Sequence, residues 1–187
     1  AVLLPLFSQT LEQADLKTGD IDLFAVCVGP GSFTGLRIGV ATAQAFAAAT
    51  NKPIAALDTL DLLAENGALF AGQVVSLIDA RNERVYYSCY TDGIKQTEDA
   101  VAPLNDVCAQ VGETRTLFVG DGAICYREQI AAHCKNAVFA PANLCYPRAS
   151  SGLALAIRHQ NKGALLAPHQ LKINYMVKPQ AERERER

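Results

Sequence analysis

Residues 28–39, VGPGSFTGLRIG, combine the flexibility and the polar side chains that a phosphate-binding loop needs. They follow an apolar run and precede an alanine-rich stretch, so we expect them to join a strand to a helix. Backbone N–H groups at the start of a helix are free to bind an anion, and glycine lets an anion approach them closely. The residues that would form such a loop are Gly29, Gly31, Ser32 and Thr34.

The sequence of this turn matches neither of the two common nucleotide-binding loops. One of these loops ends in Gly-Lys-Ser or Gly-Lys-Thr, whereas residues 35–37 are Gly-Leu-Arg. The other loop needs the spacing G-x-G-x-x-G, which these glycines do not have. Asp58 alone, roughly 20 positions further on, is a weak signal for a ribose-binding carboxylate. A remnant of an ancestral phosphate loop is therefore the less favoured interpretation.

Helix packing explains the later glycines better. Small residues recur at every fourth position, so they share one face of the expected helix at residues 35–50. Glycine in a helix costs about 1 kcal/mol relative to alanine, which implies a compensating close contact. That contact is either with the chain's own sheet or with a second chain. The stripe consists of Gly35, Gly39, Ala43 and Ala47, flanked by Leu36, Val40 and Phe46.

No complete catalytic group accompanies the turn. Ser32 or Thr34 would need a nearby base to act as a nucleophile, and one of them is expected instead to cap the helix. Arg37 would lie near the start of the helix, where the dipole disfavours a cation without an anionic neighbour. We expect such a neighbour across an interface.

The remaining polar residues give no metal motif. The three histidines are not spaced as H-x-x-x-H, so we predict no metal ligands, and His133 is expected on the surface. Asp79, Arg81 and Glu83 are interpreted as a charged turn, and the Gly-Asp-Gly sequence at residues 120–122 as a backbone turn. The histidines are His133, His159 and His169.

Composition indicates a globular protein. The 187 residues carry a formal net charge of −2, which does not favour direct binding of nucleic acid. The six cysteines form no C-x-x-C pair and lie mostly in apolar runs, so we expect buried free thiols in a reducing compartment, the cytoplasm. Neither a membrane span nor a signal peptide is evident.

Strand-like and helix-like segments alternate along the chain, which predicts an α/β protein with two similar lobes, residues 1–72 and 73–187. A helix is expected at residues 4–14, where Leu4, Phe7 and Leu11 share a face. Residues 181–187, a charged tail of alternating sign, are expected to be a solvated helix end. Further helices are expected at 59–68, 106–111, 126–134 and 150–163, the first capped by Asp58 or Thr59 and the last by Ser150 or Ser151. Strands are expected at 23–28, 54–58, 74–78, 84–90, 116–119 and 137–141, those at 74–78 and 84–90 forming a hairpin.

Five segments carry a resemblance to a known family. GPGSFTGLRIGVATAQAFA, ALDTLDLLA, IDARNERVYYSCY, FVGDGA and YMVKPQAERE occur in the order and spacing of the TsaB (YeaZ) family, bacterial proteins needed to make N6-threonylcarbamoyladenosine in tRNA. The resemblance implies the two-lobe fold of actin and the sugar kinases. It also implies a non-catalytic subunit that pairs with the enzyme TsaD and is joined by the ATPase TsaE.

The resemblance places the partner surface on the first helix and on the helix after the glycine turn. ATP or ADP and metal are then expected on TsaD and TsaE rather than on this chain, tRNA is reached indirectly, and a homodimer forms when TsaD is absent. Family members begin with a strand hairpin, which we expect before Ala1 in the natural protein. The expected partner-binding residues are Leu4, Phe7, Leu11, Gly35, Leu36, Gly39, Val40, Ala43 and Ala47.

Two other functions remain open from the residues. One is a kinase-like nucleotide-binding hydrolase that uses the glycine turn, which would need a catalytic base and a metal-binding carboxylate facing that turn. The other is a homodimeric binding module that uses the same helices on itself.

Overall fold

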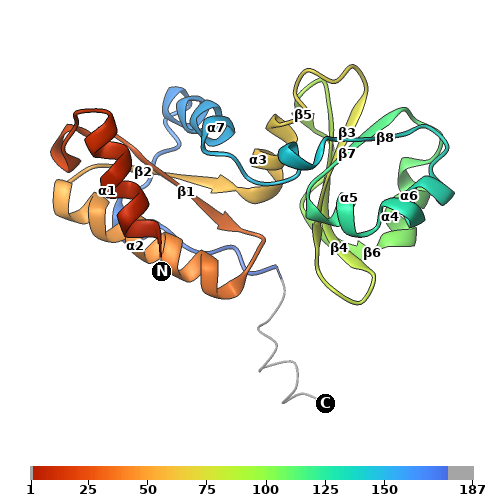
Figure 1. The fold of residues 1–187 in the computed structure, drawn as a ribbon, viewed down its shortest axis with the longest axis horizontal. Coiled ribbons are helices and arrows are strands. Elements are labelled where there is room, and N and C mark those ends of the chain that lie inside the picture. Colours follow the sequence, from red (N-terminus) through yellow and green to blue (C-terminus); the bar gives the residue numbers. More distant parts are fainter. Residues whose placement is uncertain (1, 177–187) are drawn as a thin grey trace, which may run out of the picture.

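The structure is a computed structural model that describes residues 2–176, so the expected charged tail lies outside the described residues. Two β-sheets lie side by side with a short helix, α3, between them (Figure 1). The helices are α1 (Leu3–Gln13), α2 (Phe33–Thr50), α3 (Thr59–Glu65), α4 (Leu104–Val111), α5 (Asp121–Cys125), α6 (Arg127–His133) and α7 (Ala149–Asn161). The strands are β1 (Phe24–Gly29), β2 (Ile54–Asp58), β3 (Gln73–Asp79), β4 (Arg84–Thr91), β5 (Ile94–Lys95), β6 (Ala100–Pro103), β7 (Thr116–Val119) and β8 (Ala137–Phe139).

The first sheet consists of the parallel strands β1 and β2, with Phe24 opposite Ile54. Helix α2 covers one face of this sheet and contributes Val40 and Ala47 to the core there. Helix α7 packs on the other face. The apolar run at residues 23–28 is typical of a strand covered on both faces, but Ala25 of β1 is exposed.

The second sheet has six strands in the order β5-β4-β3-β7-β8, with β6 also paired to β4. The predicted hairpin is confirmed as the antiparallel pair β3–β4. Alternate residues of β3 point to opposite faces, as the period of a strand requires. Val75 and Leu77 therefore pack among α4, α5 and α6, whereas Val74 and Ile78 pack against α3. The short strands β5 and β6 were not predicted.

Helix α2 begins at Phe33, two residues before the predicted start. The side chain of Ser32 accepts a hydrogen bond from the backbone N–H of Gly35, which confirms the serine as the cap. Arg37 consequently lies in the second turn of the helix, beyond the strongest effect of the dipole.

The other two predicted caps have different outcomes. Asp58, one of the two predicted candidates, caps α3 by accepting hydrogen bonds from the N–H groups of Leu60 and Asp61. The serine cap of α7 is wrong, because the residue before that helix is Arg148 and no side chain caps it. Ser151 donates instead to the side chain of Asn66, at 2.6 Å.

The end of the chain returns to the first sheet. Leu155 of α7 packs with Leu57 of β2, and Leu166 bridges to Ile54 of the same strand. The predicted boundary after residue 72 coincides with the start of the second sheet at Gln73. It does not account for α7 and the residues that follow, which depend on packing between distant parts of the chain.

The structure agrees with most of the expected cysteine environments. Within the described residues all six cysteines are free, and four of them are buried, but Cys125 is exposed. No helix of the described part of the chain has the length and apolar character that crossing a membrane requires.

Candidate functional site

The glycine turn lies where the first sheet faces the second. Gly29 ends β1 and pairs in register with Asp58, which ends β2. A third segment reaches the same place, because the backbone N–H of Asn174 donates to the carbonyl of Val28 at 2.8 Å. The turn is therefore built from three parts of the chain that are distant in sequence.

Residue 29 must be glycine because the returning segment at Asn174 lies directly against it. Its φ is +128°, and a Cβ atom there would lie 2.5 Å from the carbonyl oxygen of Asn174. A carbonyl oxygen carries partial negative charge, so its position over the turn disfavours a phosphate. Gly31, by contrast, has open space where a side chain would stand.

The small-residue stripe of α2 passes from solvent onto its own sheet, because Gly35 is exposed, Gly39 and Ala43 are half-buried, and Ala47 is buried. Ala47 is fully buried and Val40 is almost so, both within the core of the first sheet. For these two residues the expected partner contact is corrected, because a second chain cannot reach them. A Cβ atom on Gly39 would meet only Val26, at 3.8 Å, and one on Gly35 only the capping Ser32.

Only part of the apolar surface of α1 packs on α2. The rings of Phe7 and Phe46 lie 4.5 Å apart, and Phe7 and Leu11 are half-buried. No residue of α1 is fully buried. Leu4, which we placed on the same face, is exposed, because α1 contacts its neighbour along only part of its apolar circumference.

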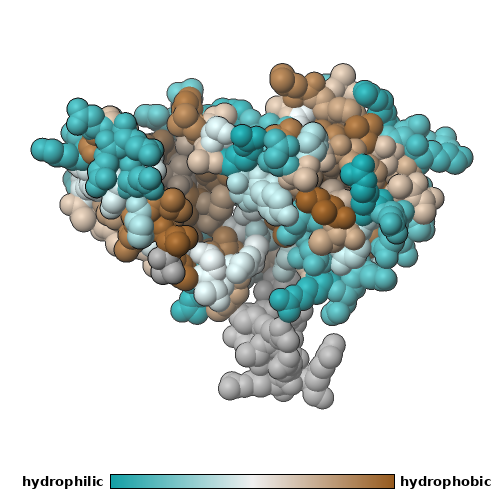
Figure 2. Space-filling view, viewed as in Figure 1, coloured by the Kyte–Doolittle hydropathy of each residue, from teal (hydrophilic) through white to brown (hydrophobic). Residues whose placement is uncertain are grey.

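A continuous part of α1 and α2 is left apolar and exposed. Figure 2 shows brown surface over these helices. Ile38 of α2 is 51% exposed, and the alanines that follow it on this face, Ala41 and Ala45, are also exposed. We call this set the α1–α2 face; its residues are Val2, Leu3, Leu4, Leu6, Phe33, Ile38, Ala41 and Ala45.

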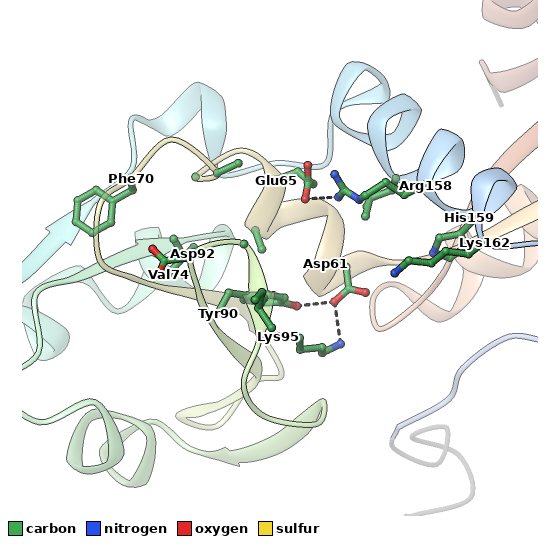
Figure 3. A pocket seen from close by; sticks show the side chains of 16 residues that line it. Asp61, Glu65, Phe70, Val74, Tyr90, Asp92, Lys95, Arg158, His159 and Lys162 are labelled. Carbon is green, nitrogen blue, oxygen red and sulfur yellow. Dashed lines mark hydrogen bonds and ion pairs between the residues drawn. The ribbon is translucent and has the colours of Figure 1, made fainter. Parts of the chain in front are cut away.

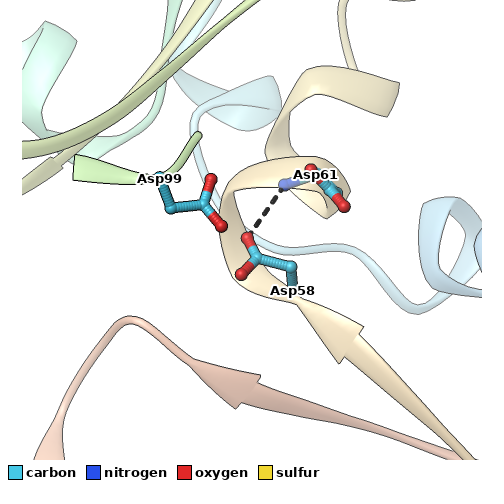
Figure 4. A group of neighbouring side chains, drawn as sticks. All are labelled: Asp58, Asp61 and Asp99. Carbon is cyan, nitrogen blue, oxygen red and sulfur yellow. Dashed lines mark hydrogen bonds between the residues drawn. The ribbon is translucent and has the colours of Figure 1, made fainter. Parts of the chain in front are cut away.

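Three carboxylates meet beside the glycine turn, a cluster that sequence reasoning missed. Asp58 and Asp61 belong to the start of α3, and Asp99 comes from the segment before β6 (Figure 4). Their oxygen atoms lie within 4.8 Å of one another. The sequence contained the Asp58–Asp61 pair, but only the folded chain brings Asp99 to it.

The ammonium group of Lys95 neutralises much of this charge. It lies 2.8 Å from Asp61 and 2.6 Å from Asp99. Burial, followed by the neighbouring Asp99 carboxyl, raises the pKa of Asp58 to about 7. Such a group exchanges a proton near neutral pH, which is a property of acid–base catalysts as well as of buried structural carboxyls. A metal ion held by the three carboxylates would have to displace Lys95.

A pocket of about 320 Å³ opens on the other side of Asp61, between α3, α7 and the β4–β5 turn (Figure 3). Asp61 accepts hydrogen bonds from Tyr90 and Lys95, and Glu65 pairs with Arg158. His159 and Lys162 border the pocket from the end of α7. Most charges of its wall are therefore already paired within the chain.

The charged turn of the second sheet is held by its own hydrogen bonds. The carboxylate of Asp79 accepts from the N–H of Arg81 and from the hydroxyl of Tyr126, both at 2.8 Å. Arg81, Asn82 and Glu83 all have left-handed φ values, from +52° to +65°. These contacts support the interpretation as a structural turn.

The glycine at residue 120 is likewise structural. Its φ is +113°, and a side chain there would collide with the carbonyl of Leu77.

His133 is exposed, as predicted, while the adjacent Cys134 is buried, so the two side chains face different ways.

Comparison with known proteins agrees with this architecture. A family model described as TsaD, tRNA N6-adenosine threonylcarbamoyltransferase, matches residues 1–167. A protein of solved structure from Pseudomonas aeruginosa, described as similar to peptidase YeaZ, superposes with a TM-score of 0.79 at 27% identity, covering 94% of this chain and 83% of that one. YeaZ from the same organism superposes with a TM-score of 0.76 at 28% identity, covering 92% and 82%.

Three curated relatives are tRNA threonylcarbamoyladenosine biosynthesis proteins TsaB. The protein from Bacillus subtilis is 38% identical over 46% of this chain and 38% of its own length. Those from Haemophilus influenzae and Escherichia coli are 37% and 36% identical, over 46% and 54% of this chain and over 37% and 46% of their own lengths. The matched part of the chain thus spans less than half of each relative.

The two sheets with their covering helices form an actin-like α/β fold. The chain belongs to the TsaD family, in its TsaB (YeaZ) branch.

Proposed function

We propose that this chain is a non-catalytic subunit for the synthesis of N6-threonylcarbamoyladenosine in tRNA, acting in the cytoplasm. The names of the TsaB relatives support the pathway. The subunit binds a TsaD enzyme, which TsaE joins, and it activates that enzyme without chemistry of its own. ATP or ADP and metal are held by those partners, and tRNA is reached through them.

The observation that carries this proposal is the α1–α2 face. Isolated exposed apolar side chains are ordinary, but a contiguous group on two neighbouring helices is typical of an interaction surface. Leu3, Leu6 and Ile38 are all more than 40% exposed. The exposed alanines of the same face, Ala41 and Ala45, leave the backbone of α2 accessible to a close helix contact.

The contacts at the glycine turn count against a nucleotide at this position. The carbonyl of Asn174 covers Gly29, and the Ser32 side chain already engages the N–H of Gly35. An anion would therefore meet a carbonyl oxygen and find fewer free N–H groups at the start of α2.

Calorimetry with TsaD and, separately, with ATP and Mg²⁺ tests the proposal. We expect TsaD to bind and ATP to give no heat. Ile38→Asp should weaken TsaD binding at least tenfold, because it places a charge in an apolar contact. The control Ile157→Asp changes a similarly exposed residue of α7, 47% against 51%, and should leave the affinity unchanged. If both variants bind TsaD as tightly as the unchanged protein does, the assignment of the α1–α2 face as the partner surface is wrong.

A kinase-like hydrolase is the second candidate, because the fold places the carboxyl of Asp58 beside Gly29. ATP binding by the chain alone, with hydrolysis lost in Asp58→Asn, would favour it. A homodimer on the α1–α2 face is the third. Sedimentation without TsaD would show a dimer that Ile38→Asp dissociates.

A further inference from the structure

The segment after α7 runs back over the first sheet as a fixed strap, residues 164–175. Leu166 and Ile54 exchange two backbone hydrogen bonds, each of 2.9 Å. Leu171 is buried in the core beneath α2. The side-chain amide of Gln44, on α2, donates to the carbonyls of Pro168 and Leu171 at 2.9 and 3.3 Å. The strap is thus attached to both the sheet and the helix.

The strap ends at the start of α2. After the Asn174 contact with Val28, the ring of Tyr175 lies 5.2 Å from that of Phe33, the first residue of the helix. The guanidinium of Arg37 lies 5.3 Å from the centre of the same Phe33 ring. An aromatic pair with a cation over it therefore joins the strap to α2.

This cluster remains accessible to a second protein. Phe33 is 39% exposed and Tyr175 is 45% exposed. Arg37 takes part in none of the ion pairs within residues 2–176. Its charge therefore has no acidic counterpart in the described part of the chain. Aromatic residues and arginine are also the residue types that contribute most to binding at protein interfaces.

Phe33, Arg37 and Ala41 follow one another at every fourth position of α2, so the cluster shares a helix face with Ala41, an exposed residue of the α1–α2 face. We infer that Phe33, Arg37 and Tyr175 form the end of the partner surface, where TsaD presents a carboxylate to Arg37 and an apolar recess to the two rings. This inference rests on the proposed function. It adds the strap as a third element of the interface, and it assigns a charge to the partner.

Calorimetry of the full chain with TsaD tests the inference through two independent variants. Tyr175→Ala and Arg37→Ala should each weaken binding about tenfold, because tyrosine and arginine are among the residue types that contribute most to binding at interfaces. The control Tyr146→Ala removes a tyrosine that is 55% exposed elsewhere and should not change the affinity. The charge-reversed variant Arg37→Glu should bind TsaD more weakly than Arg37→Ala, because its negative charge repels the expected carboxylate.

The outcomes separate this inference from the proposed function. If Ile38→Asp weakens binding but neither Tyr175→Ala nor Arg37→Ala does, the strap is not part of the interface and only the inference fails. If none of the three weakens binding, the α1–α2 face itself is wrong. If Tyr175→Ala lowers the melting temperature of the free protein, its weaker binding could come from a displaced strap. Arg37→Ala leaves the strap intact and then decides whether the cluster contacts TsaD.

Discussion

The Asp58 side chain has two roles that oppose one another. One oxygen caps α3, which favours the charged form, while burial and the Asp99 carboxyl favour the protonated form and raise its pKa to about 7. Lys95 lowers this pKa, though less than burial raises it. The groups around Asp58 are Cys27, Asp61, Lys95 and Asp99, from β1, α3, β5 and the segment before β6.

This pKa predicts how the free energy of unfolding depends on pH. Between the ordinary pKa of 3.8 and about 7 the folded state holds a proton on Asp58 that the unfolded state releases. The contribution of Asp58 to stability is therefore complete below the lower value and is lost as pH rises toward 7, by at most about 1.4 kcal/mol per pH unit. Urea unfolding at several pH values should show this loss.

The Asp58→Asn variant keeps an oxygen for the cap but cannot titrate. Its free energy of unfolding should fall less between pH 4.5 and 7 than that of the unchanged protein. Asp92→Asn, in the exposed β4–β5 turn, is the control and should follow the unchanged protein. Parallel curves for Asp58→Asn and the unchanged protein would contradict the assigned titration.

The two glycines of the turn also differ at the residue scale. Gly29→Ala should lower the free energy of unfolding by about 2 kcal/mol or more, because its Cβ would clash with a backbone oxygen at an unfavourable φ. Gly31 also has a positive φ, of +158°, but the Cβ of Gly31→Ala enters open space without a clash, so this variant should cost clearly less. Chemical denaturation measures the change in the free energy of unfolding for both variants. An equal change would show that the strap can move away from residue 29 at little cost.

At the scale of elements, α2 has two faces with different tasks. Val40 and Ala47 point into the core of the first sheet, whereas Ile38, Ala41 and Ala45 point outward. The stripe of small residues predicted from the sequence passes from one of these faces to the other. Its first residue, Gly35, is exposed, while Ala47 is fully buried.

Leucine substitutions should distinguish the faces. Ala47→Leu overfills a close-packed core and should cost about 1–3 kcal/mol of stability. Ala41→Leu lies on the outer face and should change the stability of the free protein by less than about 0.5 kcal/mol. Thermal and urea unfolding measure both. A destabilising Ala41→Leu together with a neutral Ala47→Leu would reverse the orientation of the helix.

At the scale of the molecule, the end of the chain holds the first sheet together. Only two strands form this sheet in the described residues, so much of its cover comes from α2, α7 and the strap. A two-stranded sheet is marginal without such packing. The stability of the first sheet therefore depends on residues more than 100 positions away in the sequence.

Leu171→Ala tests this dependence. It removes a buried side chain of the strap and should cost about 2–4 kcal/mol. Hydrogen exchange should show lost protection in β1, β2 and α2, with less change in β3 and β4. The control Leu153→Ala, at a residue of α7 that is 61% exposed, should have little effect. Lost protection confined to the strap would show that the sheet is stable without it.

The sequence by itself determined the features that depend on neighbours along the chain. The β3–β4 hairpin and the strand–turn–helix at residues 24–50 were predicted, and the caps of α2 and α3 were each narrowed to two residues, because each feature is specified by a short run of residues. The family was also evident from five such runs. For the same reason, two short strands without a strong local pattern, β5 and β6, were missed.

Only the tertiary structure decided which distant residues meet. It placed Asp99 beside Asp58, laid Asn174 over Gly29, and turned Val40 and Ala47 inward. Residues of the same type and spacing would permit other arrangements, because chain segments far apart in sequence are brought together by packing rather than by local preference. The glycine turn therefore looked like a phosphate loop in sequence, whereas in the folded chain it is the place where the strap is attached.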